Sequence, residues 1–306
     1  MEEKYYFGID GGGTHSRLSI TDAQGKSLCR VTSGSTNIYS VAQEKVFENL
    51  SDLFSQAFTE TGLEKKDITR GCIGSAGLAR PAEQKLFRGF FADILGPDIP
   101  VLLCTDGEIL LCGGLGGLEG YCLIAGTGSV ALGRAEDGRL VRAGGLGYML
   151  GDEGSASWTG KEAIIRAMRS LEHRDLPTSM MESILKHCGL EHSYELVQYI
   201  HHTAGKAEIA TLAPLVTEAA RNKDPLAEDI LRRGAEELAL LVASVLEQSP
   251  WIGNRTLVLA GGVMEHDEIV RNKLESLLKK QFPDLTAMDP KGTALEGACI
   301  LAMEGS

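Results

Sequence analysis

Glycine is the sequence feature that most constrains how this chain can fold. There are 37 glycines in 306 residues, and many gather in clusters at residues 11–13, 126–128, 144–154 and 261–262. Three of these clusters directly follow short apolar runs that are typical of strands. Because glycine has no Cβ, clusters at strand ends favour a close approach of backbone to a ligand over a flexible linker.

Strands and helices alternate around these clusters in two units of similar organisation, which predicts an α/β fold. In the first unit we expect strands at Tyr5–Asp10, Ser16–Asp22, Leu28–Thr32, Gly71–Ala76 and Val101–Cys104, and helices at Val41–Thr61 and Ala82–Leu95. In the second we expect strands at Tyr121–Ala125, Val130–Gly133, Arg139–Arg142 and Arg255–Ala260. Its helices are expected at Ser155–Leu171, Ser179–Cys188, Glu195–His201, Lys206–Asn222, Asp224–Gln248 and Met264–Gln281, and a last helix at Thr293–Met303 closes the chain.

Length and charge narrow the function. A chain of 306 residues suggests two domains. A formal charge of −12 argues against a nucleic-acid or membrane partner, although backbone N–H groups and Mg²⁺ could still hold a phosphorylated small molecule. The start of the chain does not resemble a signal peptide, and no stretch of about 20 apolar residues predicts a membrane span. Seven scattered cysteines favour reduced thiols in a cytoplasmic protein.

Two Gly-Thr loops are candidates for phosphate binding. In the segment 10–16, DGGGTHS, the N–H groups of Gly12 and Gly13 and the Thr14 hydroxyl could meet phosphate oxygens. Asp10 could hold Mg²⁺ through water. The segment 124–130, IAGTGSV, repeats the pattern with Gly126, Thr127 and Gly128. An ordinary glycine-rich turn is the alternative for each loop.

A third glycine pair suits a nucleoside. The segment 257–264, LVLAGGVM, is a buried strand that ends in Gly261 and Gly262 before a helix begins. Bare backbone at this point could lie against adenine or ribose, and a plain strand–helix turn is the alternative.

Taken in order, these segments resemble the sugar kinase and actin superfamily, and most closely the N-acetylglucosamine kinase branch of the BadF/BadG/BcrA/BcrD-type ATPase family. The strings that carry the likeness are GSTN at 34–37, TDG at 105–107, GTGS at 126–129 and GGLGYMLGDEGS at 144–155. The resemblance implies two ribonuclease-H-like domains with a nucleotide and sugar cleft between them. Residues 1–117, closed by a helix at 293–306, would form one domain, and residues 118–292, with a helical insertion, the other.

The resemblance also implies roles for single residues. It makes Asp106 the catalytic base that accepts a sugar hydroxyl proton, although Asp106 could equally cap a helix that begins near Glu108. Asn37 and Asp152 look like ligands of sugar hydroxyls, with a turn residue and a helix cap as the alternatives. Further residues implied to contact the sugar are Ser129, Val130 and Gly145, and Ala210 resembles part of an adenine wall. Val130 stands where animal kinases of this branch have a polar Asn.

Two functions remain open. The favoured one is an ATP- and Mg²⁺-dependent kinase, acting as a homodimer, that phosphorylates an amino sugar. N-acetylglucosamine giving its 6-phosphate is the first expectation, and glucosamine or N-acetylmuramic acid would fit the same framework. The alternative is an activator ATPase of a radical 2-hydroxyacyl-CoA dehydratase. That protein needs thiolates for an iron–sulfur cluster between two subunits, and the nearest candidates are Cys104, Cys112 and Cys122. The sugar-site strings would have no role in an activator.

Overall fold

The computed structural model describes residues 4–78, 80–134, 138–249 and 255–304, which fold into two compact units. Unit 1 comprises Met1–Glu119 and Pro290–Ser306, and unit 2 comprises Gly120–Asp289. Each unit is built on one five-stranded sheet. Among the described helices, none combines the length and the apolar character that crossing a bilayer requires.

Unit 1 is a mixed sheet in the order β3-β2-β1-β4-β5. β1, β2 and β3 pair antiparallel, and β4 and β5 continue the sheet parallel to β1. The strands are β1 (Tyr5–Gly11), β2 (His15–Thr21), β3 (Ser27–Gly34), β4 (Ile68–Ser75) and β5 (Val101–Cys104). The helices are α1 (Gln43–Thr61), α2 (Pro81–Leu95), α3 (Asp106–Leu115) and α12 (Ala294–Glu304), with short 3₁₀ turns at Lys65–Asp67 and Ala76–Leu78.

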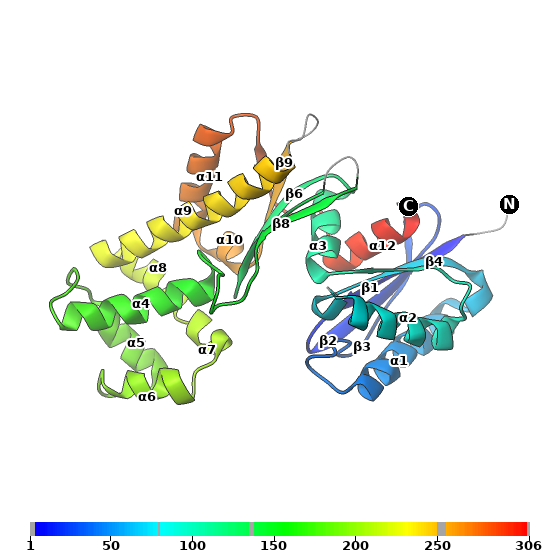
Figure 1. The fold of residues 1–306 in the computed structure, drawn as a ribbon, viewed down its shortest axis with the longest axis horizontal. Coiled ribbons are helices and arrows are strands. Elements are labelled where there is room, and N and C mark those ends of the chain that lie inside the picture. Colours follow the sequence, from blue (N-terminus) through cyan, green and yellow to red (C-terminus); the bar gives the residue numbers. More distant parts are fainter. Residues whose placement is uncertain (1–3, 79, 135–137, 250–254, 305–306) are drawn as a thin grey trace. The chain divides into compact units, whose positions relative to one another are not determined.

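Successive side chains of β1 point to opposite faces of the unit 1 sheet, and helices cover both faces (Figure 1). Phe7 and Ile9 point to one face and are fully buried in a cluster with α1 and α2, where the Phe7 and Phe54 rings meet edge to face at 4.9 Å. Gly8 points to the other face, where a Cβ would lie 2.6 Å from the Cys299 backbone nitrogen in α12. The alternating pattern of a strand therefore places α12 directly on the sheet.

The helices α3 and α12 pack backbone to backbone. A Cβ on Gly297 would lie 1.8 Å from the Ile109 carbonyl oxygen, and one on Gly113 would lie 1.9 Å from that of Thr293. Small residues at these positions let the last helix of the chain close unit 1. Around them lies a buried cluster of Cys72, Cys104, Ile109, Cys112, Ala298, Leu301 and Ala302.

Unit 2 repeats the topology of unit 1, with the strand order β10-β9-β6-β7-β8. Its strands are β6 (Gly120–Ala125), β7 (Ser129–Arg134), β8 (Leu140–Gly144), β9 (Thr256–Ala260) and β10 (Thr286–Met288). The helix directly before β9 is α9 (Pro225–Gln248), and α10 (Gly262–His266) and α11 (Glu268–Gln281) follow β9. Both units thus have ribonuclease-H-like topology, and the expected repeat is confirmed.

Five further helices lie between β8 and α9, where unit 1 has only a loop. They are α4 (Ala156–Leu171), α5 (Met180–Cys188), α6 (Glu195–His202), α7 (Lys206–Ala210) and α8 (Ala213–Arg221). α4 and α8 share one continuous apolar core with α9 and the sheet. An ion-paired Arg166 also joins α4 to Asp229 of α9 and to Asp175 in the loop that follows α4.

Two segments that were each predicted as one helix form two helices in the structure. The helix expected at Lys206–Asn222 breaks at Thr211 and Leu212, because Pro214 lacks an N–H and fits only the first turn of a new helix. The helix expected at Met264–Gln281 divides at Asp267, whose carboxylate caps α11 by accepting from the N–H groups of Ile269 and Val270. Asp224 caps α9 as predicted. The short strand β10 was not anticipated.

Candidate active site

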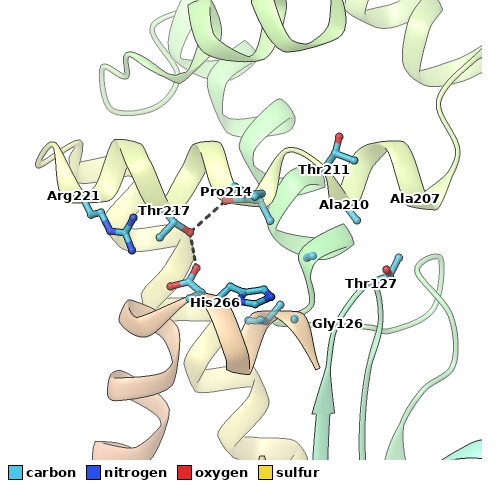
Figure 2. A pocket seen from close by; sticks show the side chains of 14 residues that line it. Gly126, Thr127, Ala207, Ala210, Thr211, Pro214, Thr217, Arg221 and His266 are labelled. Atoms are coloured by element: carbon cyan, nitrogen blue, oxygen red, sulfur yellow. Dashed lines mark hydrogen bonds between the residues drawn. The ribbon is translucent and has the colours of Figure 1, made fainter. Parts of the chain in front are cut away.

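A pocket of about 520 Å³ opens within unit 2 beside the loop that follows β6 (Figure 2). Gly126 and Thr127 lie at one end of it and Arg221 at the other. Its lining residues are Gly126, Thr127, Ala156, Ala207, Ala210, Thr211, Ala213, Pro214, Thr217, Arg221, Gly262, Val263, His266 and Asp267. A pocket of this volume, largely lined by small apolar side chains, is large enough for a nucleoside.

Four predicted nucleotide residues line this pocket, namely Gly126, Thr127, Ala210 and Gly262. Gly261 lies just outside the lining and has a φ of +94°, a conformation that favours glycine. A Cβ at Gly261 would also lie 2.6 Å from the Ala125 carbonyl oxygen. The paired glycines therefore let the start of α10 approach the end of β6 closely.

The break between α7 and α8 forms the opposite wall. Ala210 ends α7 and Pro214 lies in the first turn of α8, so small and apolar side chains face the pocket. Farther along, the Thr217 hydroxyl donates to Asp267 Oδ2 at 2.5 Å and joins α8 to the start of α11. Sequence reasoning placed Ala210 in an adenine wall but missed the helix break beside it, although Pro214 is a recognisable sign of a helix start.

The predicted sugar ligands of unit 2 gather at the start of β7. The Ser129 N–H donates to Asp152 Oδ1 at 3.2 Å, and the Ser129 hydroxyl donates to the Glu153 carbonyl at 2.7 Å. Gly145 N–H donates to the Ser129 carbonyl at 2.8 Å, and a Cβ on Gly145 would lie 3.1 Å from that of Val130. Ser129, Val130, Gly145 and Asp152 therefore form one group beside the pocket.

Asp152 is the most constrained member of this group. Its residue is 3% exposed and has a φ of 63°, which is uncommon for any residue but glycine. Lys206 Nζ lies 2.7 Å from its Oδ2, as an ion pair without hydrogen-bond alignment. The alternative role of Asp152 as a helix cap is wrong, because the Ser155 hydroxyl accepts from Trp158 N–H and caps α4.

In unit 1, the first Gly-Thr loop and the GSTN segment form one polar network. Gly12, Gly13 and Thr14 connect β1 to β2. The Ser35 hydroxyl donates to the Gly12 carbonyl at 3.0 Å, and the Ser16 and Thr36 hydroxyls lie 2.8 Å apart. Two motifs some 20 residues apart in sequence are thus held together by buried hydroxyls.

Asn37 lies at the end of this network. Its Oδ1 accepts from Tyr39 N–H at 2.9 Å, so Asn37 does act as a turn residue. Within the described parts of the chain its Nδ2 group has no hydrogen bond, which leaves a donor for a ligand.

Two carboxylates stand where strands of unit 1 end. Asp10 in β1 pairs with Gly74 of the neighbouring strand β4, and Gly74 pairs with Cys104, the last residue of β5. Asp106 follows Cys104 by two residues, so both carboxylates lie near the same edge of the sheet. Burial raises the pKa of Asp10, and the negative charge of Asp106 raises it further, while Arg17, 3.8 Å away, lowers it. Mg²⁺ commonly keeps several waters and takes one or two carboxylates. A partly desolvated carboxylate with a second one acting on it fits such an ion.

Asp106 is the first residue of α3 but not its cap. Thr105 caps the helix, with its hydroxyl accepting from Glu108 N–H while Glu108 accepts from Thr105 N–H. The alternative prediction for Asp106 is therefore wrong. Its carboxylate is exposed and accepts from Gly107 N–H at 3.0 Å. It can accept a proton from a ligand without weakening the helix.

The thiols that an activator ATPase would need are poorly suited to metal binding. Cys104 is 3% exposed, and Cys112 and Cys122 are fully buried. Burial raises the pKa of Cys122 to about 12, so the thiolate form that binds iron is disfavoured. Cys104 Sγ lies 3.8 Å from Cys72 Sγ inside the α3–α12 cluster.

The sequence matches the BadF/BadG/BcrA/BcrD ATPase family over residues 7–302. An N-acetylmuramic acid/N-acetylglucosamine kinase from Clostridium acetobutylicum is 33% identical, over 98% of this chain and 98% of that protein. A glucosamine kinase from Vibrio cholerae is 26% identical, over 97% of this chain and 95% of that one.

Solved structures agree with this match. The crystal structure of a candidate N-acetylglucosamine kinase from Chromobacterium violaceum superposes with a TM-score of 0.73 at 27% identity, over 97% of this chain and 98% of that one. The likeness extends across both units, so it covers all the segments described above.

Proposed function

The chain belongs to the BadF/BadG/BcrA/BcrD ATPase family, and from this premise we propose that it transfers the γ-phosphoryl group of ATP to O6 of N-acetylglucosamine. Its relatives are kinases of amino sugars, and an ATP-dependent sugar kinase is the activity that they support. The acetylated hexosamine and the O6 position are the finer part of the proposal.

One observation supports the proposal, namely that a single loop of unit 2 joins the pocket to the buried carboxylate proposed for the sugar. Gly126 and Thr127 end the nucleotide pocket, and two residues later Ser129 holds the buried Asp152. A nucleotide whose base lies against Ala210 and Gly262 would direct its phosphates toward this loop. A sugar hydroxyl bound by Asp152 would then meet the terminal phosphate, and such positioning supplies much of the rate in phosphoryl transfer.

The reaction follows from the residue chemistry. Asp106 accepts the O6 proton while O6 forms its bond to the γ-phosphorus, the bond from that phosphorus to the bridging oxygen breaks, and ADP leaves. Asn37 and Asp152 orient the sugar, since the amide can donate and the carboxylate can accept two hydroxyl donors. Thr127 of unit 2 and the loop of Gly12, Gly13 and Thr14 of unit 1 are the groups that we propose as donors to the phosphates.

Asp10 is the residue that we propose for Mg²⁺, through water. The ion would neutralise charge on the β- and γ-phosphates. The electrostatic effect of Asp106 on Asp10 supports this placement, because a cation near either carboxylate favours the ionised form of both.

The test is an ADP-release assay with ATP, Mg²⁺ and each of N-acetylglucosamine, glucosamine and N-acetylmuramic acid. We expect the highest kcat/KM with N-acetylglucosamine, and a product whose phosphorus couples to the C6 protons in NMR spectra. A higher value with either other sugar would replace the proposed substrate but keep the activity. Absence of ADP release with all three would contradict the sugar kinase itself.

A further inference from the structure

Lys206 is a charged residue at the site for which the reaction above has no role. It is the first residue of α7, the helix whose Ala207 and Ala210 line the nucleotide pocket. Its side chain is one-third exposed, and its Nζ lies 2.7 Å from Asp152 Oδ2. One lysine thus joins the wall of the nucleotide pocket to the buried carboxylate proposed for the sugar.

The ammonium also lies against the phosphate loop. A Cβ on Gly128 would lie 2.7 Å from Lys206 Nζ and 2.9 Å from Asp152 Oδ1. Only a residue without a side chain allows these two groups to approach the loop so closely. The cation therefore lies beside Gly128, in the loop proposed for the phosphates.

We propose that Lys206 binds the terminal phosphate of ATP and that it shares its ammonium between that phosphate and Asp152. This inference rests on the proposed kinase function. An ammonium carries three donors, and Asp152 Oδ2 engages at most one of them in the structure. A compact cation next to a transferring phosphoryl group stabilises the charge spread over its oxygens.

Sharing one cation couples the two substrates. Sugar hydroxyls that donate to Asp152 compete with the Lys206 ammonium for the same carboxylate. An ammonium displaced from Asp152 becomes available to the phosphate. Sugar binding should therefore increase the affinity for the triphosphate, and the triphosphate should increase the affinity for sugar by the same factor.

The alternative is a purely structural clamp, in which Lys206 only holds Asp152 and α7 in place. If Lys206 is only a clamp, its removal should weaken sugar binding. It should also change the affinities for a nucleoside triphosphate and a nucleoside monophosphate by the same factor. The phosphate role predicts that the two nucleotides respond differently, because only the triphosphate reaches beyond the loop.

Calorimetry with the full chain separates these roles, with AMPPNP as a non-hydrolysed triphosphate and AMP as the monophosphate. We expect Lys206→Met to weaken AMPPNP by about 10- to 100-fold, the range for a hydrogen bond to a charged group, and to leave AMP within about twofold. Lys206→Arg should restore part of the AMPPNP affinity. The control Lys279→Met removes the same charge from the exposed end of α11 and should change neither affinity.

The coupling gives a second readout. Saturating N-acetylglucosamine should tighten AMPPNP binding to the wild-type chain and have no such effect on Lys206→Met. Equal AMPPNP affinity in wild type and Lys206→Met, or an equal loss for AMPPNP and AMP, would overturn the phosphate role. A wild-type chain that binds no AMPPNP and phosphorylates no sugar would instead overturn the proposed function.

Discussion

At the scale of single residues, Thr105 caps α3, and its neighbour Asp106 is left available for the proposed role of base. Thr105 and Glu108 satisfy the first turn of α3 through a capping box, so the helix does not need the Asp106 side chain. Asp106 is exposed at the end of a strand, and its charge raises the pKa of Asp10. Because the Asp106 side chain does not cap α3, it can be substituted without weakening the helix. The proposed base role can therefore be tested by mutation.

Asp106→Asn should lower kcat by about 10²- to 10⁴-fold, the usual contribution of a positioned base. The amide retains the shape of the carboxylate but cannot accept the O6 proton, so the dissociation constant for sugar should stay within about tenfold. Turnover, sugar affinity and a thermal melt should be measured on the same preparation. Wild-type turnover in this variant would remove Asp106 from the mechanism.

At the scale of elements, glycines and ion pairs determine how closely helices pack. α12 meets α3 through Gly297 and Gly113, and α4 meets α9 through Arg166 and Asp229. The first contact is a close approach of backbone to backbone, and in the second the Arg166 guanidinium also binds Asp175. The two contacts should therefore respond to different perturbations.

Gly297→Ala should destabilise unit 1 by about 1–3 kcal/mol, as overpacking does, because the new methyl group would collide with the Ile109 carbonyl oxygen. The matched control is Gly89→Ala in the exposed part of α2, where a Cβ meets nothing within 4 Å. The control should stabilise by about 0.4–1 kcal/mol, since alanine favours helix. Denaturant unfolding of the two variants should give shifts of opposite sign.

Arg166→Met should destabilise unit 2 by about 1–3 kcal/mol near neutral pH, because charge-assisted bonds to Asp175 and Asp229 are lost. Arg166 lowers the pKa of Asp175 to about 2 from the ordinary value of 3.8. The stabilisation is therefore present above pH 4 and is lost as the pH falls toward 2.

Denaturant unfolding at about pH 6.5, above that range, and at about pH 2.5, within it, checks this. The difference between wild type and Arg166→Met should shrink at the lower pH. Arg174→Met, which removes an exposed pair with Glu172, should show almost no effect at either pH. A difference that does not depend on pH would mean that packing rather than charge carries the contact.

Elements were easier to predict than their contacts. Apolar runs and glycine clusters located every described strand except β10, because such patterns reflect local backbone requirements. The break at Leu212 was missed because the apolar pattern continues through it while Pro214 interrupts the helix. The pair of Lys206 and Asp152 could not be inferred, because 54 positions separate the two and only the packing of α7 brings them together.

At the scale of the whole molecule, the two units have the same sheet topology but differ in their inserted helices and in the candidate site residues that they carry. The five helices of unit 2 between β8 and α9 include α7 and α8, which form one wall of the pocket proposed for the nucleotide. Unit 1 has no helix at the corresponding point and carries Asp10, Asn37 and Asp106, which we propose for Mg²⁺, sugar binding and proton transfer. A ligand that consists of a nucleoside alone should therefore be bound by unit 2.

Adenosine at about 100 times its dissociation constant should stabilise unit 2 by about 2.7 kcal/mol. Hydrogen exchange can follow this through the slowest amides of α9, compared with those of α1 in unit 1. We expect slower exchange in α9 and little change in α1. Equal slowing in both helices would show that the two units unfold together.

The position of α12 has a consequence for synthesis on the ribosome. Every other element of unit 1 lies before Gly120, but the helix that covers Gly8, Cys72 and Cys104 comes after the whole of unit 2 in the sequence. A nascent chain must therefore keep one apolar face of its first sheet uncovered while the whole of unit 2 is translated. Chains that terminate early would carry this face into the cell, where chaperones and proteases recognise such surfaces.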